Sequence, residues 1–239
     1  MALIRLDVDD DGVAFVVLDD PDRRNAISLP LNDELVRAFD ELEAAGARAV
    51  VVTGAGSAFC AGADLGSLGA ARDAAAFSSL YAGFLRVAAS PLPTIAAVNG
   101  PAVGAGMNLA LGCDVILAGR SARFDPRFLQ IGLHPGGGHL WRLRRRAGDQ
   151  AVAAMVLFGD ALDGQAAAAA GVAWRCVDDD DLLPEARRLA RRAARVPREL
   201  LARAQESVAA LPGVETADDA VALEITPQVW SAEQGWFGS

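Results

Sequence analysis

Two stretches rich in glycine and alanine offer backbone N–H groups that small side chains leave uncovered. The first is Thr53–Leu65 (TGAGSAFCAGADL), and the second lies within Pro91–Asp114 (PLPTIAAVNGPAVGAGMNLALGCD). Each follows a short apolar run that predicts a buried strand, and the second continues into a predicted helix. Because the first N–H groups of a helix have no partner within it, a helix that starts this way forms a site for negative charge. Both loops are expected at the C-terminal edge of one sheet, where ligands of open α/β sheets bind.

None of these glycine clusters matches a nucleotide-binding or hydrolase motif. A G-x-G-x-x-G fingerprint needs a third glycine, but Phe59, Leu109 and Trp141 stand at that position in the three candidate clusters. The G-x-S-x-G nucleophile elbow is also absent. The chain has no lysine, which excludes a Schiff base, covalently bound pyridoxal phosphate and a P-loop. A phosphate must therefore be held by arginine, backbone N–H groups or a helix dipole.

The composition limits the class of partner. A formal net charge of −9 argues against nucleic acid, because that partner needs a basic surface. The basic run Arg142–Arg146 (RLRRR) is the exception, and it fits either a solvated helix face or a contact to a phosphate-bearing small molecule. With 52% hydrophobic and 22% charged residues, the 239-residue chain is globular and long enough for one large domain or for one domain with a small appendage.

No targeting segment, disulfide framework or metal site is predicted. No apolar run is long enough to cross a membrane, and the acidic N-terminus (MALIRLDVDDDG) does not resemble a signal peptide, so we expect a cytoplasmic protein without a membrane span. Cys60, Cys113 and Cys176 are widely spaced and odd in number, which predicts reduced thiols.

Hydrophobic periodicity predicts an α/β core that is followed by helices alone. Strands are predicted at residues 3–8 and 13–18, as a hairpin, and at 48–53, 94–98, 114–118 and 173–177. Helices are predicted at 30–46, 73–90, 104–112, from the turn at 135–138 through 146, and at 151–158, 165–170, 182–194, 197–211 and 214–229. The segment 124–133 is predicted to be short and irregular. We divide the chain into a core, residues 1–180, and a helical region, residues 181–239.

Four segments of the chain together carry a family resemblance. They are RRNAI (Arg23–Ile27), FCAGADL (Phe59–Leu65), PxxAAVNGPAVGAGMNLALGCD (Pro93–Asp114) and IGLHPGGGHLWRL (Ile131–Leu143). In order and spacing they resemble the enoyl-CoA hydratase/isomerase family, the crotonases, from about residue 3 to residue 210. Each segment alone is moderately specific, whereas the four together are a strong indication.

The resemblance implies a fold, an assembly and a ligand. The expected fold is a spiral of ββα turns in the core. The helical region would then serve in a homotrimer or a dimer of trimers and would cover part of the coenzyme A. The implied ligand is an acyl-CoA thioester, so coenzyme A arrives as part of the substrate and no separate cofactor or metal is implied.

The resemblance also places an oxyanion hole. Its two donors are the backbone N–H groups of Ala63 and Ala105, and alanine at position 105 is compatible because the N–H group does the work. A thioester carbonyl held there becomes enolate-like when Cβ is attacked or Cα is deprotonated, and each such donor is typically worth ~3–4 kcal/mol. The implied substrate-binding positions are Arg24, Ala26, Ala61, Gly62, Asp64, Leu65, Phe128 and Gly136.

Three of these residues have a structural interpretation as well. Arg24 fits either a contact to a coenzyme A phosphate or a plain surface arginine. For Asp64 we favour an N-cap of the following helix over a catalytic role. Asn99 is predicted to stabilise the turn between its strand and the next helix.

The chain departs from the family pattern at the acid/base positions. Hydratases of the family use two glutamates, and the matching residues here are Asn108 and Phe128. Asn108 cannot accept a proton, and Phe128 narrows and dries the pocket. The aspartate used by some isomerases corresponds to Gly136, so that substitute is absent too.

Two histidines are the candidate replacements for the missing base. His134 and His139 lie in the loop that the resemblance places against the acyl pocket, and histidine suits proton transfer near neutral pH. Their spacing of five does not suit a zinc pair on a helix. Either one can instead be a packed or solvent-facing histidine. Asp125 is a further candidate, although we favour a turn or capping role for it.

The sequence therefore predicts an enzyme of the enoyl-CoA hydratase/isomerase family in which two-glutamate hydration is weak or absent. Three possibilities stay open at this point. The chain is an isomerase or acyl-CoA hydrolase that uses His134 or His139, a hydratase with a displaced base, or a non-catalytic acyl-CoA binder or regulatory partner.

Overall fold

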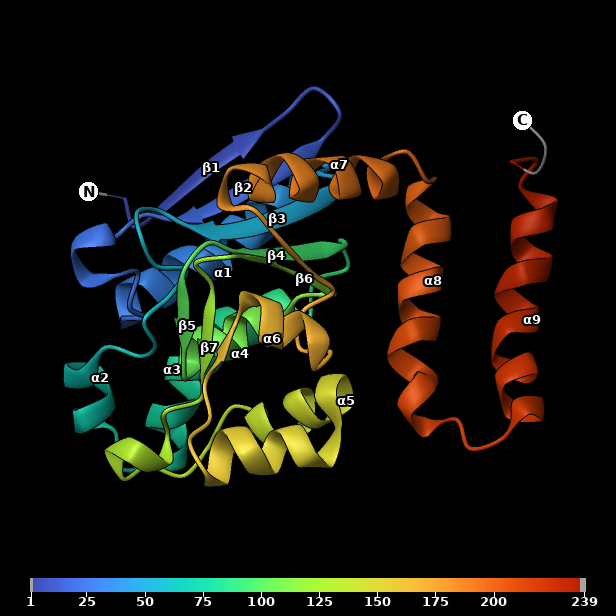
Figure 1. The fold of residues 1–239 in the computed structure, drawn as a ribbon. Coiled ribbons are helices and arrows are strands. Elements are labelled where there is room, and N and C mark those ends of the chain that lie inside the picture. Colours follow the sequence, from blue (N-terminus) through green and yellow to red (C-terminus); the bar gives the residue numbers. More distant parts are fainter. Residues whose placement is uncertain (1, 237–239) are drawn as a thin grey trace.

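The computed structural model describes residues 2–236, and its main sheet is built from six strands (Figure 1). The strand order is β1–β2–β3–β4–β6–β9. The predicted hairpin of β1 and β2 is antiparallel, and every later neighbour in the sheet pairs in parallel. The strands are β1 (Ile4–Val8), β2 (Val13–Leu18), β3 (Ala49–Gly54), β4 (Thr94–Val98), β6 (Val115–Gly119) and β9 (Arg175–Val177).

Most helices follow the predicted segments within a few residues, and α2 was not predicted from periodicity. Two expectations are corrected: the helix predicted to end at residue 146 continues to Val152 as α5, and the segment predicted as a helix at 151–158 is a π-helical turn at Ala153–Leu157. The first of the long helices shows why the prediction works, because the Ser28 hydroxyl accepts a hydrogen bond from the Leu31 N–H group (3.4 Å) and Pro30 occupies the first turn. The helices are α1 (Leu29–Ala44), α2 (Leu65–Ala70), α3 (Ala74–Ala88), α4 (Ala105–Gly112), α5 (His139–Val152), α6 (Gly164–Ala169), α7 (Leu182–Ala194), α8 (Arg198–Ala210) and α9 (Ala217–Glu233).

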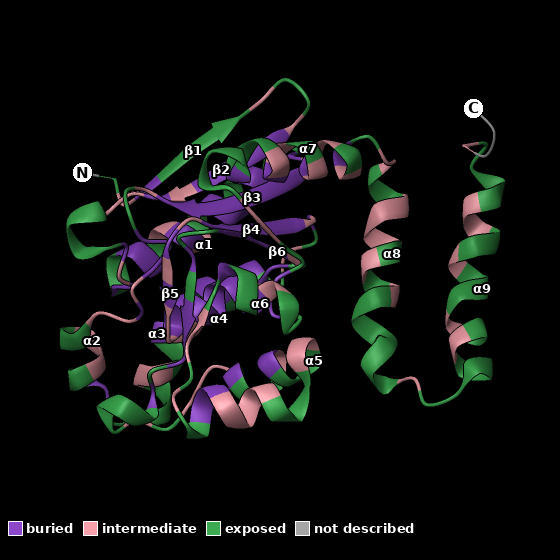
Figure 2. Cartoon of the chain, viewed as in Figure 1, coloured by how far each residue is buried: buried purple, intermediate pink, exposed green. Residues whose placement is uncertain are grey.

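Both faces of the main sheet are covered, which explains why its central strands are apolar without alternation. One face packs with α1, α3, α4 and α5 into the larger core, which includes Phe39, Phe84 and Met107. The other face packs against α7 through Leu182, Ala186 and neighbouring alanines. Figure 2 shows β3, β4 and α4 as the most completely buried elements. The glycine-rich helix is thus fixed at the centre of the molecule.

A second, smaller sheet was not predicted. It consists of β5 (Pro101–Val103), β7 (Arg123–Asp125) and β8 (Leu162–Asp163), so part of the segment expected to be irregular is a strand. Strands of two or three residues carry no periodic pattern, and these pair with segments far away in the sequence. The small sheet is nevertheless important, because β5 leads directly into α4.

The C-terminal helices divide by their packing. Helix α7 covers the main sheet, whereas α8 and α9 form a hairpin that stands away from the body (Figure 1). No residue of α8 or α9 is buried, and the Arg203 guanidinium lies 4.0 Å from the centre of the Trp230 ring between them. Residues 237–239 of the predicted helical region lie outside the described residues. Within residues 2–236, no helix is both long and apolar enough to cross a bilayer. Large apolar side chains are exposed on this hairpin and its turn: Val208, Leu211, Val221, Ile225 and Val229.

Candidate active site

The two glycine-rich loops are joined by backbone hydrogen bonds. The Cys60 N–H group donates to the Pro101 carbonyl (3.0 Å), and the Val103 N–H group donates to the Cys60 carbonyl (3.0 Å). Gly106 explains the need for glycine at this junction, since a Cβ atom there would lie 2.2 Å from the Cys60 carbonyl oxygen. The first loop therefore lies directly against β5 and the start of α4.

A third segment, residues 24–27, closes the group. The Ile27 N–H group donates to the Gly62 carbonyl (2.7 Å), and the Asp64 N–H group donates to the Ile27 carbonyl (2.8 Å). Asn25 is fully buried in the left-handed region (φ 57°), and its side-chain amide donates to the carbonyls of Ala55 (3.0 Å) and Ala58 (2.8 Å). These bonds fix the curvature of the first loop, so its N–H groups have a defined direction.

Two N–H groups at this junction have no hydrogen-bond partner within residues 2–236. They belong to Ala63 in the first loop and to Ala105, the first residue of α4. The neighbours of Ala63 are both engaged with Ile27, and Gly62 turns the chain with a φ of 105°. Ala63 and Ala105 line the same cavity. Two N–H groups without a protein partner therefore belong to residues from different loops that line one cavity.

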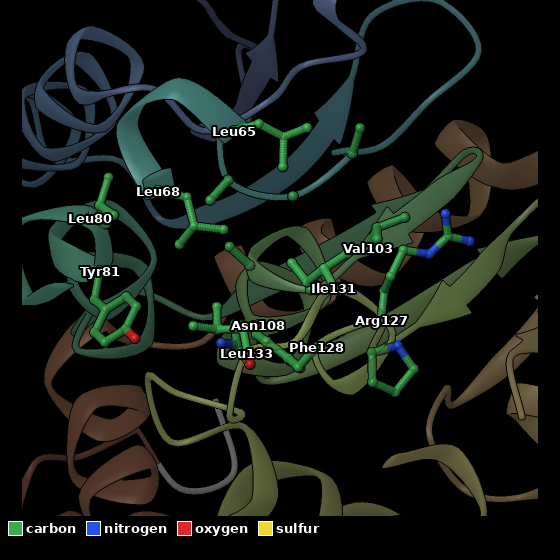
Figure 3. A pocket seen from close by; sticks show the side chains of 16 residues that line it. Leu65, Leu68, Leu80, Tyr81, Val103, Asn108, Arg127, Phe128, Ile131 and Leu133 are labelled. Atoms are coloured by element: carbon green, nitrogen blue, oxygen red, sulfur yellow. The ribbon is translucent and has the colours of Figure 1, made fainter. Parts of the chain in front are cut away.

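That cavity has a volume of about 100 Å³ and a mainly apolar wall (Figure 3). Only three of its lining side chains are polar, namely Tyr81, Asn108 and Arg127. No carboxylate and no imidazole is among the lining residues that the structure describes. The apolar lining is supplied by Leu65, Leu68, Leu80, Val103, Pro126, Phe128, Ile131 and Leu133, together with small residues of the two loops.

Asn108 is buried, and both ends of its side-chain amide are bonded. Its Nδ2 group donates to the Gly136 carbonyl (3.0 Å), and its Oδ1 atom lies 2.7 Å from Nδ1 of His139. A backbone carbonyl can only accept, so the nitrogen of Asn108 must face Gly136 and its oxygen must face His139. His139 therefore carries its proton on Nδ1 and a lone pair on Nε2.

His139 is a neutral, buried residue. Burial lowers the pKa of its imidazole to about 4, and the positive charge of Arg142 contributes in the same direction. Its ring meets Phe128 edge to face, with 4.9 Å between ring centres. Nε2 is buried without a hydrogen-bond partner in the described part of the chain. His139 thus packs behind Phe128 and Asn108 rather than lining the cavity.

Known proteins are similar to this chain over nearly its whole length. A family model described as enoyl-CoA hydratase/isomerase matches residues 9–229. The chain belongs to the enoyl-CoA hydratase/isomerase family. A probable enoyl-CoA hydratase of Mycobacterium tuberculosis is 45% identical to it, with 96% of this chain and 93% of that protein covered.

Solved structures confirm the predicted crotonase fold. An enoyl-CoA hydratase of Bacillus anthracis has a TM-score of 0.91 at 27% identity, covering 98% of this chain and 92% of the other. An enoyl-CoA hydratase from Thermobifida fusca, solved in complex with acetoacetyl-CoA, has a TM-score of 0.87 at 28% identity. The match covers 97% of this chain and 95% of the Thermobifida fusca chain.

His134 and His139 do not lie against the acyl pocket, where the sequence predicted them. His134 is exposed, and its Nδ1 atom is 2.8 Å from the Pro135 carbonyl. The loop 131–143 does face the cavity, but through Ile131 and Leu133. Neither histidine lines the cavity. The expectation that a histidine base lies at the cavity wall is therefore corrected. The periodicity of a loop is too irregular to tell which of its side chains points inward.

Asp125 likewise does not line the cavity, because its carboxylate pairs with arginine side chains. Its buried carboxylate forms an ion pair with the Arg127 guanidinium and lies 4.0 Å from that of Arg123. The Arg127 Nε group donates to the same carboxylate oxygen at 3.1 Å. Asp125 therefore has a structural role at the end of β7, as the sequence favoured.

The substrate-binding positions implied by the resemblance separate into two groups. Residues of the first group line the cavity: Ala61, Gly62, Leu65 and Phe128. Residues of the second group do not: Arg24, Ala26, Asp64 and Gly136.

The residues outside the cavity have identifiable contacts. Asp64 caps α2 by accepting from the Ser67 N–H group (2.9 Å) and hydroxyl (3.0 Å), and these bonds lower the pKa of its carboxyl. The Gly136 carbonyl holds Asn108. Arg24 is exposed, and its carbonyl accepts from the Ala61 N–H group (3.0 Å). Asp64 thus has the N-cap role that the sequence favoured.

Asn99 bridges the loops rather than stabilising only its own turn. Its amide Nδ2 group donates to the carbonyls of Gly54 (2.9 Å) and Gly56 (3.0 Å), and its oxygen accepts from the Gly54 N–H group (3.3 Å). The sequence did not indicate that Asn99 bonds to the first loop, nor that the Asn25 side chain does so. The sequence does hold a signal for Asn25, namely an asparagine at the end of the turn PDRRN. Asparagine tolerates the left-handed backbone region that this residue adopts.

Several cavity residues were not singled out by the sequence analysis, and the polar ones among them are Tyr81 and Arg127. Tyr81 lies on α3, between Phe77 and Phe84, with ring centres 6.3 Å and 5.4 Å away. Helical spacing alone predicts a core aromatic at this position, and no motif surrounds it. Within residues 2–236, no cluster of three or more histidine, cysteine or acidic residues is arranged to hold a metal.

Proposed function

We propose that this protein binds an acyl-CoA thioester with the carbonyl oxygen between the N–H groups of Ala63 and Ala105. One observation carries the proposal: the two residues of the joined loops whose N–H groups lack a partner within residues 2–236 both line one mainly apolar cavity. The family membership and the acetoacetyl-CoA complex of a related structure support it. The acyl chain is then expected against Leu65, Leu68 and Leu80.

The chemistry that follows is stabilisation of an enolate. As charge moves onto the thioester oxygen, both N–H groups and the N-terminal end of α4 already point at it, so no reorganisation is required. Preorganised donors of this kind are worth about 3–4 kcal/mol each in the transition state. We further propose that the coenzyme A moiety extends past the segment with Arg24 and Ala26, where Arg24 can meet a phosphate.

The same geometry argues against ordinary water addition. Ordinary hydration in this family uses one carboxylate to activate water and a second to handle the α proton, and the described lining has no carboxylate or imidazole. The Asn108 oxygen already accepts from His139. His134 is exposed and His139 is packed behind Phe128, so an isomerase or hydrolase that uses either histidine as its base has no support from the geometry.

Two measurements test this function together. Calorimetry with butyryl-CoA is expected to show saturable binding below millimolar concentration. A crotonyl-CoA hydration assay is expected to give a kcat far below about 1 s⁻¹, the low end of ordinary enzymes. Absence of binding at millimolar ligand would contradict the oxyanion-hole proposal. Hydration at an ordinary rate would instead show that a base reaches the cavity, and binding without any conversion of acyl-CoA would favour a binding protein.

The projecting hairpin suggests an assembly. Helices α8 and α9 expose apolar side chains that the chain itself does not cover, among them Val221, Ile225 and Val229. We propose that they pack against other copies of this chain in a homotrimer or a dimer of trimers. Light scattering on the intact chain checks this, and a monomer at micromolar concentration would contradict it.

A further inference from the structure

The Tyr81 hydroxyl occupies a corner of the cavity next to Gly136. A Cβ atom at position 136 would lie 2.2 Å from the hydroxyl oxygen, so a larger residue there would displace the Tyr81 side chain from its place. The Gly136 carbonyl in turn holds the Asn108 amide (3.0 Å). Figure 3 shows the hydroxyl end of Tyr81 turned toward Asn108. Tyr81 and Asn108 therefore present their polar ends to the same part of the cavity.

No protein group engages this hydroxyl. The Tyr81 ring is held by Phe77 and Phe84, but its oxygen has no hydrogen-bond partner within residues 2–236. Burial raises the pKa of the phenol, so the hydroxyl is protonated near neutral pH. A half-buried donor aimed into a cavity without a protein partner is available to a ligand.

Tyr81 also differs chemically from the other polar lining residues. The Asn108 amide does not exchange protons with a substrate. The Arg127 guanidinium does not lose its proton in proteins, and it is paired with Asp125. Among the lining residues that the structure describes, a phenol is therefore the one group that can give and take a proton.

We propose that Tyr81 is a catalytic residue that carries the proton between the α carbon of a bound acyl-CoA and solvent. The proposal rests on the proposed acyl-CoA function. In the forward step the Tyr81 phenolate takes the proton from Cα, and the C–H electron pair forms the enolate double bond. The negative charge moves to the thioester oxygen, which Ala63 and Ala105 hold. In the reverse step the phenol returns a proton to Cα, and water reprotonates the phenolate.

This assignment determines the pH dependence. Proton removal needs the phenolate, which is scarce near neutral pH, so its rate is expected to rise about tenfold per pH unit below the pKa of Tyr81. The charged or titratable groups on the elements beside this part of the cavity are Arg127, which lies across the cavity from Tyr81 (Figure 3), and His139 and Arg142 on α5. Arg142 lies over the Phe84 ring (6.0 Å to its centre) and His139 is neutral, so neither competes for the proton.

Tyr81 is the only tyrosine in the chain, which makes a sharp experiment possible. Expression with a ring-fluorinated tyrosine changes this one phenol and lowers its pKa. The measurement is deuterium uptake at Cα of butyryl-CoA in D₂O, followed by mass spectrometry over a range of pH. The pH profile is expected to move to lower pH by the amount that fluorination lowers the phenol pKa, which a purely structural tyrosine would not cause.

Two variants complete the test. Tyr81→Phe keeps the ring packing and is expected to slow deuterium uptake at least about 100-fold with little change in calorimetric binding. Ser79→Ala removes a hydroxyl from the same helix, where it bonds only the Ala75 carbonyl (3.0 Å), and is expected to behave as the unaltered protein.

The possible outcomes distinguish the role of Tyr81 from the acyl-CoA function on which that role rests. An unmoved profile in the fluorinated protein, undiminished exchange in Tyr81→Phe, or no exchange despite binding would each overturn the role of Tyr81 alone. A failure of the unaltered protein to bind butyryl-CoA would overturn the proposed function itself.

Discussion

Replacement of Ala105 by proline is expected to slow deuterium uptake at Cα of a bound acyl-CoA by about 100- to 1,000-fold, because it removes one of the two proposed oxyanion donors. Ala105 is the first residue of α4, and its N–H group has no partner within residues 2–236. Proline is well accepted at the first position of a helix, where the missing N–H group costs no intrahelical bond. The thermal midpoint is therefore expected to change little.

The matched control for this variant is Ala105→Gly, which keeps the N–H group and is expected to exchange at close to the normal rate. Uptake is measured by mass spectrometry, and folding is checked by circular dichroism. If the proline variant folds poorly, an α-hydroxy acid at position 105 deletes the same N–H group without adding a ring. Normal exchange in both donor-deleted proteins would show that Ala105 does not hold the thioester oxygen.

Acidification from about pH 6.5 to about pH 4 is expected to lower the free energy of unfolding through His139. The pKa of its imidazole is about 4 in the folded chain and 6.5 when unperturbed, so between these values the unfolded state binds a proton that the folded state does not. Stability therefore falls as the pH falls through this window. At about 1.4 kcal/mol per unit, the loss is on the order of 3 kcal/mol.

His139→Gln provides the comparison. A glutamine amide can still donate to the Asn108 oxygen but does not titrate. Urea unfolding is measured at several pH values between 4 and 7 for both proteins. The difference in unfolding free energy between them is expected to shift by about 3 kcal/mol across that window, since the carboxylates contribute to both alike. Parallel curves would mean that the native imidazole is protonated as easily as the unfolded one.

The sequence by itself determined the main sheet, most helices and the family. Short continuous runs rich in β-branched residues, such as Ala49–Gly54, favour strands covered on both faces, and the periodic segment Leu182–Ala194 was found as the predicted helix. Through the family resemblance the sequence also pointed to Ala63 and Ala105, whose N–H groups have no partner within residues 2–236. The sequence also shows directly that positions 108 and 128 carry asparagine and phenylalanine instead of carboxylates.

Only the tertiary structure decided which side chains face the cavity. The short strands of the second sheet depend on partners distant in the sequence, and they carry no local pattern. A loop has no fixed period, so the sequence could not tell that His134 turns outward while His139 packs behind Phe128. Tyr81 has the spacing of an ordinary core aromatic. Its hydroxyl reaches the cavity because α3 packs across the loop that carries Gly136, a contact between segments that no local pattern encodes.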